Sequence, residues 1–103
     1  MSRKTMLCMK ECAPIFAMLQ DPRRQEITQL LFENRELSVT ALTEKLALSR
    51  PAVSHHLKLL LDAGLVQVRQ EGKERYYQLK LKPALDRLKK LTASIENDME
   101  QMK

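Results

Sequence analysis

The sequence is poor in several residue types, and their scarcity narrows what the chain can be. Its 103 residues include two glycines, two cysteines, two histidines, two tyrosines, two phenylalanines and no tryptophan. With so few glycines there is no glycine-rich loop to cradle a phosphate, and neither a nucleophile elbow nor a metal-hydrolase spacing occurs. We therefore expect that the protein is not an enzyme and uses no cofactor.

Long apolar runs are also missing from the sequence. No run of about 18 apolar residues occurs, so no segment is expected to span a membrane. The first residues, MSRKTMLCMKECAPIF, are interrupted by Lys10 and Glu11 and lack the apolar region of a secretory signal. These features predict a cytoplasmic protein, in which Cys8 and Cys12 are reduced thiols rather than a structural disulfide.

What is present is an ordinary globular composition with an excess of positive charge. The chain is 44% hydrophobic and 30% charged, with a net charge of +5. Its length suits one compact domain, and so small a core makes an obligate dimer unsurprising. Residues 1–25 carry five Lys/Arg against two acidic residues and residues 49–80 carry six against three, whereas residues 26–48 carry two against four. An anionic partner is therefore expected to meet the two basic flanks.

Capping residues and apolar spacing predict five helices and one hairpin. In chain order we expect a first helix with the apolar stripe Met9, Cys12, Phe16 and Leu19, helices over residues 22–34, 38–47 and 49–63, a hairpin over residues 65–80 that turns at Gly72, and a last helix from Lys82-Pro83. Pro14 should make the first helix start late or bend, because it cannot donate a hydrogen bond to the preceding turn. Gly64 should end the fourth helix in a left-handed conformation.

The helix over residues 49–63 has an apolar face and a polar face. At about 100° per residue, the residues expected in the core are Val53, Leu57, Leu60 and Leu61. The residues on the opposite, exposed side are Pro51, Ser54, His55, Lys58 and Asp62. His56 lies on the flank between them. Adjacent residues of a helix do not share a face, so His55 and His56 cannot chelate one metal ion together.

The short helix before Ser49 and the helix after it predict a helix-turn-helix over residues 38–63. In that motif the second helix enters the major groove of DNA with its N-terminal residues against the base edges. The cations of the following hairpin, the wing over residues 65–80, suit phosphates or a minor groove. The residues predicted to contact double-stranded DNA are Ser49, Arg50, Pro51, Ser54, His55, Lys58, Arg69, Lys73 and Arg75.

These residues also have an interpretation without DNA. His55 can be an ordinary exposed histidine, and His56 is expected to pack and hydrogen-bond within the domain. The wing cations can belong to a solvated turn that Glu71 and Glu74 partly neutralise. The alternative function is a winged-helix module that binds protein instead of DNA, and such a module should expose a large apolar patch on this face.

The last helix carries an apolar stripe longer than a domain of this size needs. Its members are Leu81, Leu85, Leu88, Ile95, Met99 and Met102, with Thr92 in the gap of the series. A helix over residues 83–102 is roughly 30 Å long, so we expect the stripe to meet a partner. Residues 1–20 and 83–103 of this single domain, residues 1–103, are predicted to be dimerisation helices. The predicted interface residues are Met9, Phe16, Leu85, Leu88, Ile95 and Met99.

The segment LALSRPAVSHHLKLLLDAGLVQVRQEGKERYYQL, with LQDPRRQEITQLL upstream, resembles the ArsR/SmtB family of bacterial winged helix-turn-helix repressors. The resemblance covers nearly the whole chain. It implies a mostly α fold with a two-stranded β-hairpin, and a homodimer formed by the first and last helices. It also implies that each protomer places a recognition helix in one half of an inverted-repeat operator, and that a metal ion, metalloid or thiol oxidant relieves repression.

The sequence departs from the metal sites that this resemblance implies. Arsenic and cadmium sensors of the family carry two cysteines in an ELCVCDL-like stretch of the third helix, where this chain has ELSVTAL, with Ser38 and Thr40 in place of the thiols. Zinc and nickel sensors use histidine and acidic ligands on the last helix, and here that helix has no histidine. Both family sites are therefore expected to be absent, and which metal, if any, acts elsewhere stays open.

Cys8 and Cys12 remain as the place where a signal would act, with three interpretations open. The two thiols can pack as small hydrophobic side chains. They can form a thiol switch, because Lys4 and Lys10 are near enough to favour the thiolate. They can also bind a thiophilic metal or metalloid, provided that a dimer supplies further thiolates.

Overall fold

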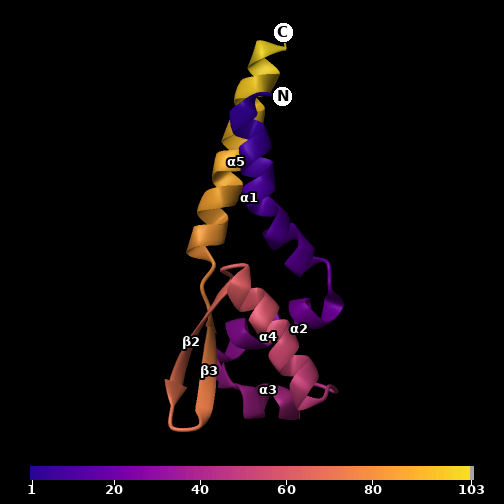
Figure 1. Ribbon diagram of the computed structural model, residues 1–103, viewed down its shortest axis with the longest axis vertical. Coiled ribbons are helices and arrows are strands. Elements are labelled where there is room, and N and C mark those ends of the chain that lie inside the picture. The colour runs from indigo at the N-terminus through magenta and orange to yellow at the C-terminus, as the bar shows by residue number, and fades with distance from the viewer. Residues whose placement is uncertain (103) are drawn as a thin grey trace.

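The computed structural model describes residues 1–102, which form five helices and three strands. In chain order these are α1 (Arg3–Leu19), α2 (Pro22–Asn34), β1 (Glu36–Ser38), α3 (Val39–Lys45), α4 (Arg50–Asp62), β2 (Val66–Glu71), β3 (Glu74–Leu79) and α5 (Lys82–Gln101). The molecule measures 56 × 24 × 21 Å. It is elongated because α1 and α5 run side by side as a stalk, while the other elements form a body at one end of it (Figure 1).

The helices of the body begin where their capping residues predicted. Asp21, Ser38 and Ser49 each accept a hydrogen bond from a backbone N–H two or three residues later, at 2.8, 3.0 and 3.3 Å. These bonds satisfy amides that the first turn of a helix leaves without partners. The predicted left-handed conformation of Gly64 is confirmed, with φ of 76°, and Gly72, where the hairpin turns as predicted, has φ of 63°. The third helix ends at Lys45, two residues before its predicted end at Ala47.

The first helix differs from its prediction. It begins at Arg3, capped by Ser2, and Pro14 lies inside it, so the expected late start is wrong. Its buried residues are Thr5, Cys8, Cys12 and Ile15. Packing of this face against α5 offsets the hydrogen bond that Pro14 cannot make. Phe16 and Leu19, expected on the apolar stripe, are 45% and 43% exposed.

The wing is a hairpin, as predicted, but it belongs to a sheet of three strands rather than two. The antiparallel order is β1-β3-β2, with Leu37 opposite Tyr77. The sequence pattern missed β1 because three residues are too few to show alternation. A contact across the sheet holds β1 in place: the Arg69 guanidinium of β2 donates to both carboxylate oxygens of Glu36, at 3.0 and 2.7 Å.

Two apolar clusters stabilise the molecule. The larger cluster fills the body, and its buried members are Ile15, Ile27, Leu31, Val39, Leu42, Leu46, Val53, Leu57, Leu60, Ala63, Leu65, Val66, Tyr77 and Ala84. The smaller one lies in the stalk, where Cys8, Cys12 and Leu91 are buried between α1 and α5. The body therefore holds α4 and the wing against one core, while the stalk has little interior of its own. Within residues 1–102, none of the helices is long and apolar enough to cross a membrane.

Candidate nucleic-acid interface

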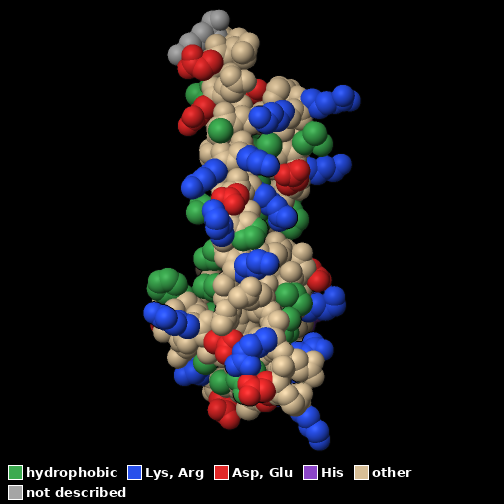
Figure 2. Space-filling view, turned by 90° about the vertical axis from the view of Figure 1, so that its left-hand side faces the viewer, with side chains coloured by type: hydrophobic (Ala, Val, Ile, Leu, Met, Phe, Trp, Pro, Cys, Tyr) green, Lys and Arg blue, Asp and Glu red, His purple; other side chains and the backbone are tan. Residues whose placement is uncertain are grey.

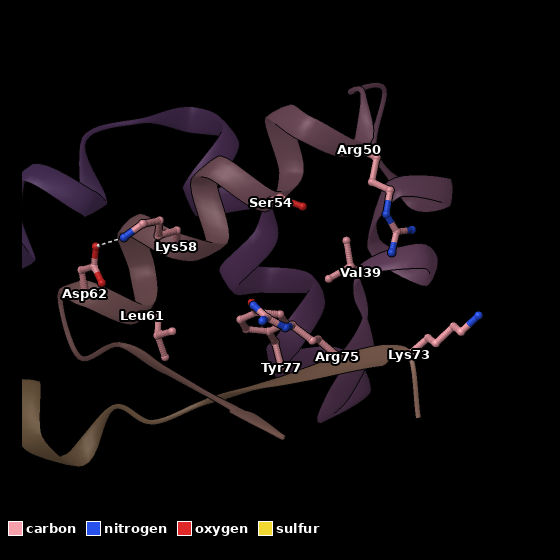
Figure 3. Close-up of a pocket in the computed structure, with 9 residues that line it drawn as sticks. All are labelled: Val39, Arg50, Ser54, Lys58, Leu61, Asp62, Lys73, Arg75 and Tyr77. Atoms are coloured by element: carbon pink, nitrogen blue, oxygen red, sulfur yellow. Dashed lines mark hydrogen bonds and ion pairs between the residues drawn. The ribbon is translucent and has the colours of Figure 1, made fainter. Parts of the chain in front are cut away.

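A hollow of about 560 Å³ lies between α4 and the wing. Figure 3 shows residues of α4 along one side of it and Arg75 and Tyr77 of β3 along the other. Its lining residues are Val39, Arg50, Ser54, Lys58, Leu61, Asp62, Lys73, Arg75 and Tyr77. Five of the nine predicted DNA contacts thus meet in one groove, although they come from two segments of the sequence. Four of those five are cations.

The exposed face of α4 is the one that helical spacing predicted. Pro51, Ser54, His55 and Lys58 are all exposed, while Val53, Leu57 and Leu60 are buried in the core. Leu61 was expected in the core, but it is 36% exposed and lines the groove. Its neighbours Leu60 and Ala63 are buried in the core, so Leu61 lies on the side of α4 that faces the groove rather than the body.

Arg50 connects the start of α4 to both α3 and the wing. Its Nη1 donates to Thr40 Oγ1 at 2.9 Å, and Thr40 Oγ1 donates to Glu74 Oε2 at 3.0 Å. Arg50 Nη2 also lies 3.7 Å from Glu74 Oε1. Ser38 and Thr40, where the family resemblance would place thiols, thus carry hydroxyls with structural roles: one caps α3 and the other belongs to this link.

Arg69 lies on the other face of the wing. Adjacent residues of a strand point to opposite faces, so Tyr76 faces away from the groove that Tyr77 lines. The Arg69 guanidinium lies 4.5 Å from the Tyr76 ring centroid and also donates to Glu71 at 2.7 Å. Its hydrogen bonds lower the pKa of Glu36 below the usual carboxyl range. Of the predicted wing cations, Lys73 and Arg75 line the groove and Arg69 does not.

The two histidines have different surroundings. His55 is exposed, whereas His56 is half-buried with its Nδ1 3.3 Å from Arg24 Nη1. Burial lowers the pKa of His56 below its usual value. The predicted packing of His56 within the domain is therefore confirmed. Its partner Arg24 was missed, because the contact joins helices 32 residues apart. Among residues 1–102 there is no cluster of three or more His, Cys, Asp or Glu side chains that could hold a metal ion.

Both cysteines lie inside the stalk. Cys8 is 7% exposed, Cys12 is fully buried, and the Cys12 thiol donates to the backbone oxygen of Arg87 at 3.4 Å. Burial raises the pKa of the Cys12 thiol. The expectation that nearby lysines favour the thiolate is therefore wrong for Cys12, and the surroundings are those of a packed side chain.

The predicted dimer residues divide into two groups. Met9, Leu88 and Ile95 are partly buried between α1 and α5 of the same chain. Phe16, Leu85 and Met99 are 45%, 48% and 58% exposed. Figure 2 shows apolar side chains along the outside of the stalk, interspersed with lysine and arginine. On α5 the buried residues are Ala84, Leu91 and Ser94, whereas Thr92, expected in the stripe, is exposed.

The sequence family described as bacterial regulatory protein, arsR family, matches residues 21–68, which run from the cap of α2 into β2. An uncharacterized HTH-type transcriptional regulator of Methanocaldococcus jannaschii is 37% identical over 70 residues, covering 68% of this chain and 79% of that relative. This chain belongs to the ArsR family. The family resemblance read from the sequence is confirmed.

Further comparisons agree with this ArsR-family assignment. The arsenical resistance operon repressor of Staphylococcus xylosus is 43% identical over 70 residues, which cover 68% of this chain and 66% of that protein. The solved structure of an ArsR-like transcriptional regulator from Rhodococcus sp. RHA1 matches 91% of this chain and 84% of its own, with 29% identity and a TM-score of 0.74. This ArsR-family protein is a winged helix-turn-helix, DNA-binding transcriptional regulator, and the relatives that it matches are regulators rather than enzymes.

Proposed function

We propose that this ArsR-family protein represses transcription as a cytoplasmic homodimer that binds an inverted-repeat operator. Helix α4 of each protomer enters the major groove of one half-site, and the wing lies along the flanking backbone. The observation that carries the proposal is the groove between α4 and β3, where Arg50, Lys58, Lys73 and Arg75 gather around Ser54. Positively charged side chains of α4 and of the wing line the same open groove, and this arrangement suits a DNA backbone that lies between the two elements.

The exposed residues of α4 divide into base-reading and phosphate-binding groups. Ser54 and His55 present a hydroxyl and an imidazole near the start of the helix, where recognition helices read base edges. Lys58 and the wing residues Lys73 and Arg75 bind phosphates. At the N-terminus of α4, Ser49, Arg50 and Pro51 lie where a phosphate meets free amides and a positive helix dipole. Arg69 stabilises the sheet through Glu36 instead.

The dimer forms through the stalk. Residues 1–20 and 83–103 are the dimerisation segments, of which Lys103 lies outside the described residues. The exposed Phe16, Leu85 and Met99 supply the apolar surface that a second copy covers. A two-fold axis along the stalk would separate the two recognition helices by about one turn of DNA, roughly 34–36 Å.

A winged-helix module for protein binding is less well supported. Such a module should present a large apolar patch on α4, but Ser54, His55 and Lys58 make that face polar and basic.

The finer question is what releases this repressor from DNA. A thiol-reactive or thiophilic-metal signal would act at Cys8 and Cys12 in the stalk. Their burial and the raised pKa of Cys12 favour a packing role instead.

The deciding experiment is binding to DNA from the protein's own promoter region, compared with random DNA. We expect specific binding, and His55→Ala and Ser54→Ala should each weaken it by about 1–3 kcal/mol with less effect on random DNA. Equal affinity of the parent for promoter and random DNA would contradict the proposal. Oxidant and thiophilic metal ions, added in separate arms, test the release step.

A further inference from the structure

Arg24 of α2 lies where three helices meet. Its Nε donates to the backbone oxygen of Met18 at 3.2 Å and its Nη2 to that of Ala17 at 3.4 Å, both in the last turn of α1. Its Nη1 lies 3.6 Å from Asp21, the cap of α2. The Arg24 side chain is only 14% exposed, so the guanidinium is held in one place by the end of α1.

The remaining contact of this guanidinium is with α4. Arg24 Nη1 lies 3.3 Å from Nδ1 of His56, the residue that follows His55 on the recognition helix. A guanidinium has donors and no acceptor. His56 Nδ1 must therefore accept the hydrogen bond, which leaves the ring proton on Nε2 and the imidazole neutral. A protonated His56 would place an N–H and a positive charge against Arg24, and the contact would be lost.

We propose that Arg24 is a positioning residue for DNA recognition, which fixes the orientation of α4 relative to the stalk by donating to a neutral His56. The inference deepens the proposed function and rests on it. The stalk is the proposed dimer interface and α4 is the proposed reading helix, so this contact helps set how far apart two recognition helices lie. His56 thereby serves DNA binding without facing DNA.

Burial and the neighbouring charges together lower the pKa of His56, which favours the neutral imidazole that the contact with Arg24 requires. Burial is the largest influence and lowers the pKa of His56; Arg24, His55 and Arg23 also lower it, whereas Asp21 raises it. The pKa of His56 in the folded protein lies below the ordinary value of 6.5. The neutral His56 therefore contributes its full stabilisation of the folded protein above pH 6.5, and this contribution is lost as the pH falls through the lowered pKa. Acidification should therefore break the contact through which Arg24 links α4 to the end of α1.

The chain allows a clean pH experiment because it has only two histidines. The variant His55→Asn leaves His56 as the single histidine, and the double variant His55→Asn/His56→Asn has none. An asparagine oxygen can take roughly the place of Nδ1 and accept from Arg24, but it does not titrate. Operator affinity and melting temperature are measured for both variants from about pH 8 to about pH 5, across the range where histidine titrates.

We expect acidification to weaken operator binding by His55→Asn about five- to tenfold more than binding by the double variant, in the range usual for coupling between sites. The melting temperature of His55→Asn should fall with it. Identical pH profiles for the two variants would overturn the proposal.

A second pair of variants tests the arginine. Arg24→Lys keeps the charge but cannot reach the α1 carbonyls, Asp21 and His56 together. Arg23→Lys is its matched control, since Arg23 is exposed and lies 4.0 Å from Glu26 on the surface. Arg24→Lys should weaken operator binding about tenfold, a typical coupling effect, with a smaller effect on random DNA.

The outcomes separate this proposal from the function on which it rests. A parent chain that binds no specific DNA refutes the proposed function, and the positioning role with it. A parent that binds its operator, while Arg24→Lys and Arg23→Lys bind it equally well, refutes the positioning role alone. If Arg24→Lys does not fold, the pH profiles of His55→Asn and His55→Asn/His56→Asn still test the positioning role.

Discussion

Arg50 and Arg69 differ in how closely a carboxylate pairs with the guanidinium, and this difference determines whether the side chain is available to bind a phosphate. Arg50 lies beside the wing and Arg69 within it, and their side chains are about half exposed, at 54% and 51%. Arg69 donates to two carboxylates on the face away from the groove. Arg50 donates to the Thr40 hydroxyl and lies 3.7 Å from Glu74, beyond hydrogen-bond distance. Donors of Arg50 are therefore free to meet a phosphate, whereas those of Arg69 are largely used.

The first prediction compares Arg75→Ala with Arg69→Ala. Arg75→Ala should weaken binding to all DNA sequences similarly and reduce the slope of log K against log salt by about one, as the loss of one phosphate contact requires. Arg69→Ala should leave that slope unchanged and lower the melting temperature, because it removes the side-chain contact between Arg69 of β2 and Glu36 of β1 across the sheet. Salt titrations of both variants, with thermal unfolding, test this. A reduced slope for Arg69→Ala would show that Arg69 contacts the DNA after all.

The second prediction concerns the cysteines. Because Cys8 and Cys12 are buried and burial raises the pKa of Cys12, both thiols should resist alkylation in the folded protein at neutral pH and react after unfolding. The measurement is the rate of iodoacetamide labelling with and without denaturant. Release from DNA by oxidant should be the same for the parent and for Cys8→Ala/Cys12→Ala. Rapid labelling of the folded chain, or a release that the double variant loses, would instead support a thiol switch.

Among the elements, α4 has clear stop signals as well as start signals. At its end the Gly64 N–H donates to Leu61 O and the Leu65 N–H donates to Leu60 O, both at 3.0 Å. These two bonds form a Schellman motif, which needs a left-handed residue after the cap. The motif turns the chain from α4 into β2, so it sets where the wing begins relative to the recognition helix.

The third prediction tests that turn. Gly64→Ala should destabilise the protein by about 1–2 kcal/mol, the cost of a left-handed conformation for a residue with a Cβ. The added Cβ itself has room, since the nearest side-chain atom it would meet is Arg87 Nη1 at 3.9 Å. Gly64→Asn is the control and should cost less, because asparagine tolerates this conformation. Urea unfolding measures both, and equal losses would show that crowding rather than φ is responsible.

At the scale of the whole molecule, the stalk leaves apolar surface uncovered. Two paired helices have little interior, and Phe16, Leu85 and Met99 remain on the outside. Leu88, by contrast, packs between α1 and α5. A charge at Leu88 would therefore disturb the folded protomer, whereas a charge at Leu85 would test the surface between protomers.

The fourth prediction is that Leu85→Glu converts a dimer into monomers at micromolar concentration. Burying an unpaired carboxylate in the interface costs several kcal/mol, which a small dimer cannot offset. Phe32→Glu is the control: Phe32 is 72% exposed on α2, outside the stalk, and this variant should remain dimeric. Sedimentation equilibrium measures both. A monomeric parent, or a dimeric Leu85→Glu, would show that these helices do not form the interface.

The sequence alone determined the elements whose causes are local. Helix caps act within three residues, and left-handed glycines act within one turn, so Ser38, Ser49, Gly64 and Gly72 predicted boundaries correctly. Helical spacing likewise predicted which face of α4 is exposed. The caps and faces predicted a helix-turn-helix and its wing, and the family resemblance came from the residues of that same segment.

The tertiary structure decided everything that depends on a distant partner. Thr40 and Glu74 are 34 residues apart, Glu36 and Arg69 are 33 apart, and Arg24 and His56 are 32 apart. Periodicity carries no information about such pairs, so β1 and the outward turn of Arg69 could not be predicted. The stripe of the last helix depends on a distant partner in the same way: spacing identifies an apolar face, but only the packed position of α1 shows which part of that face the chain already covers.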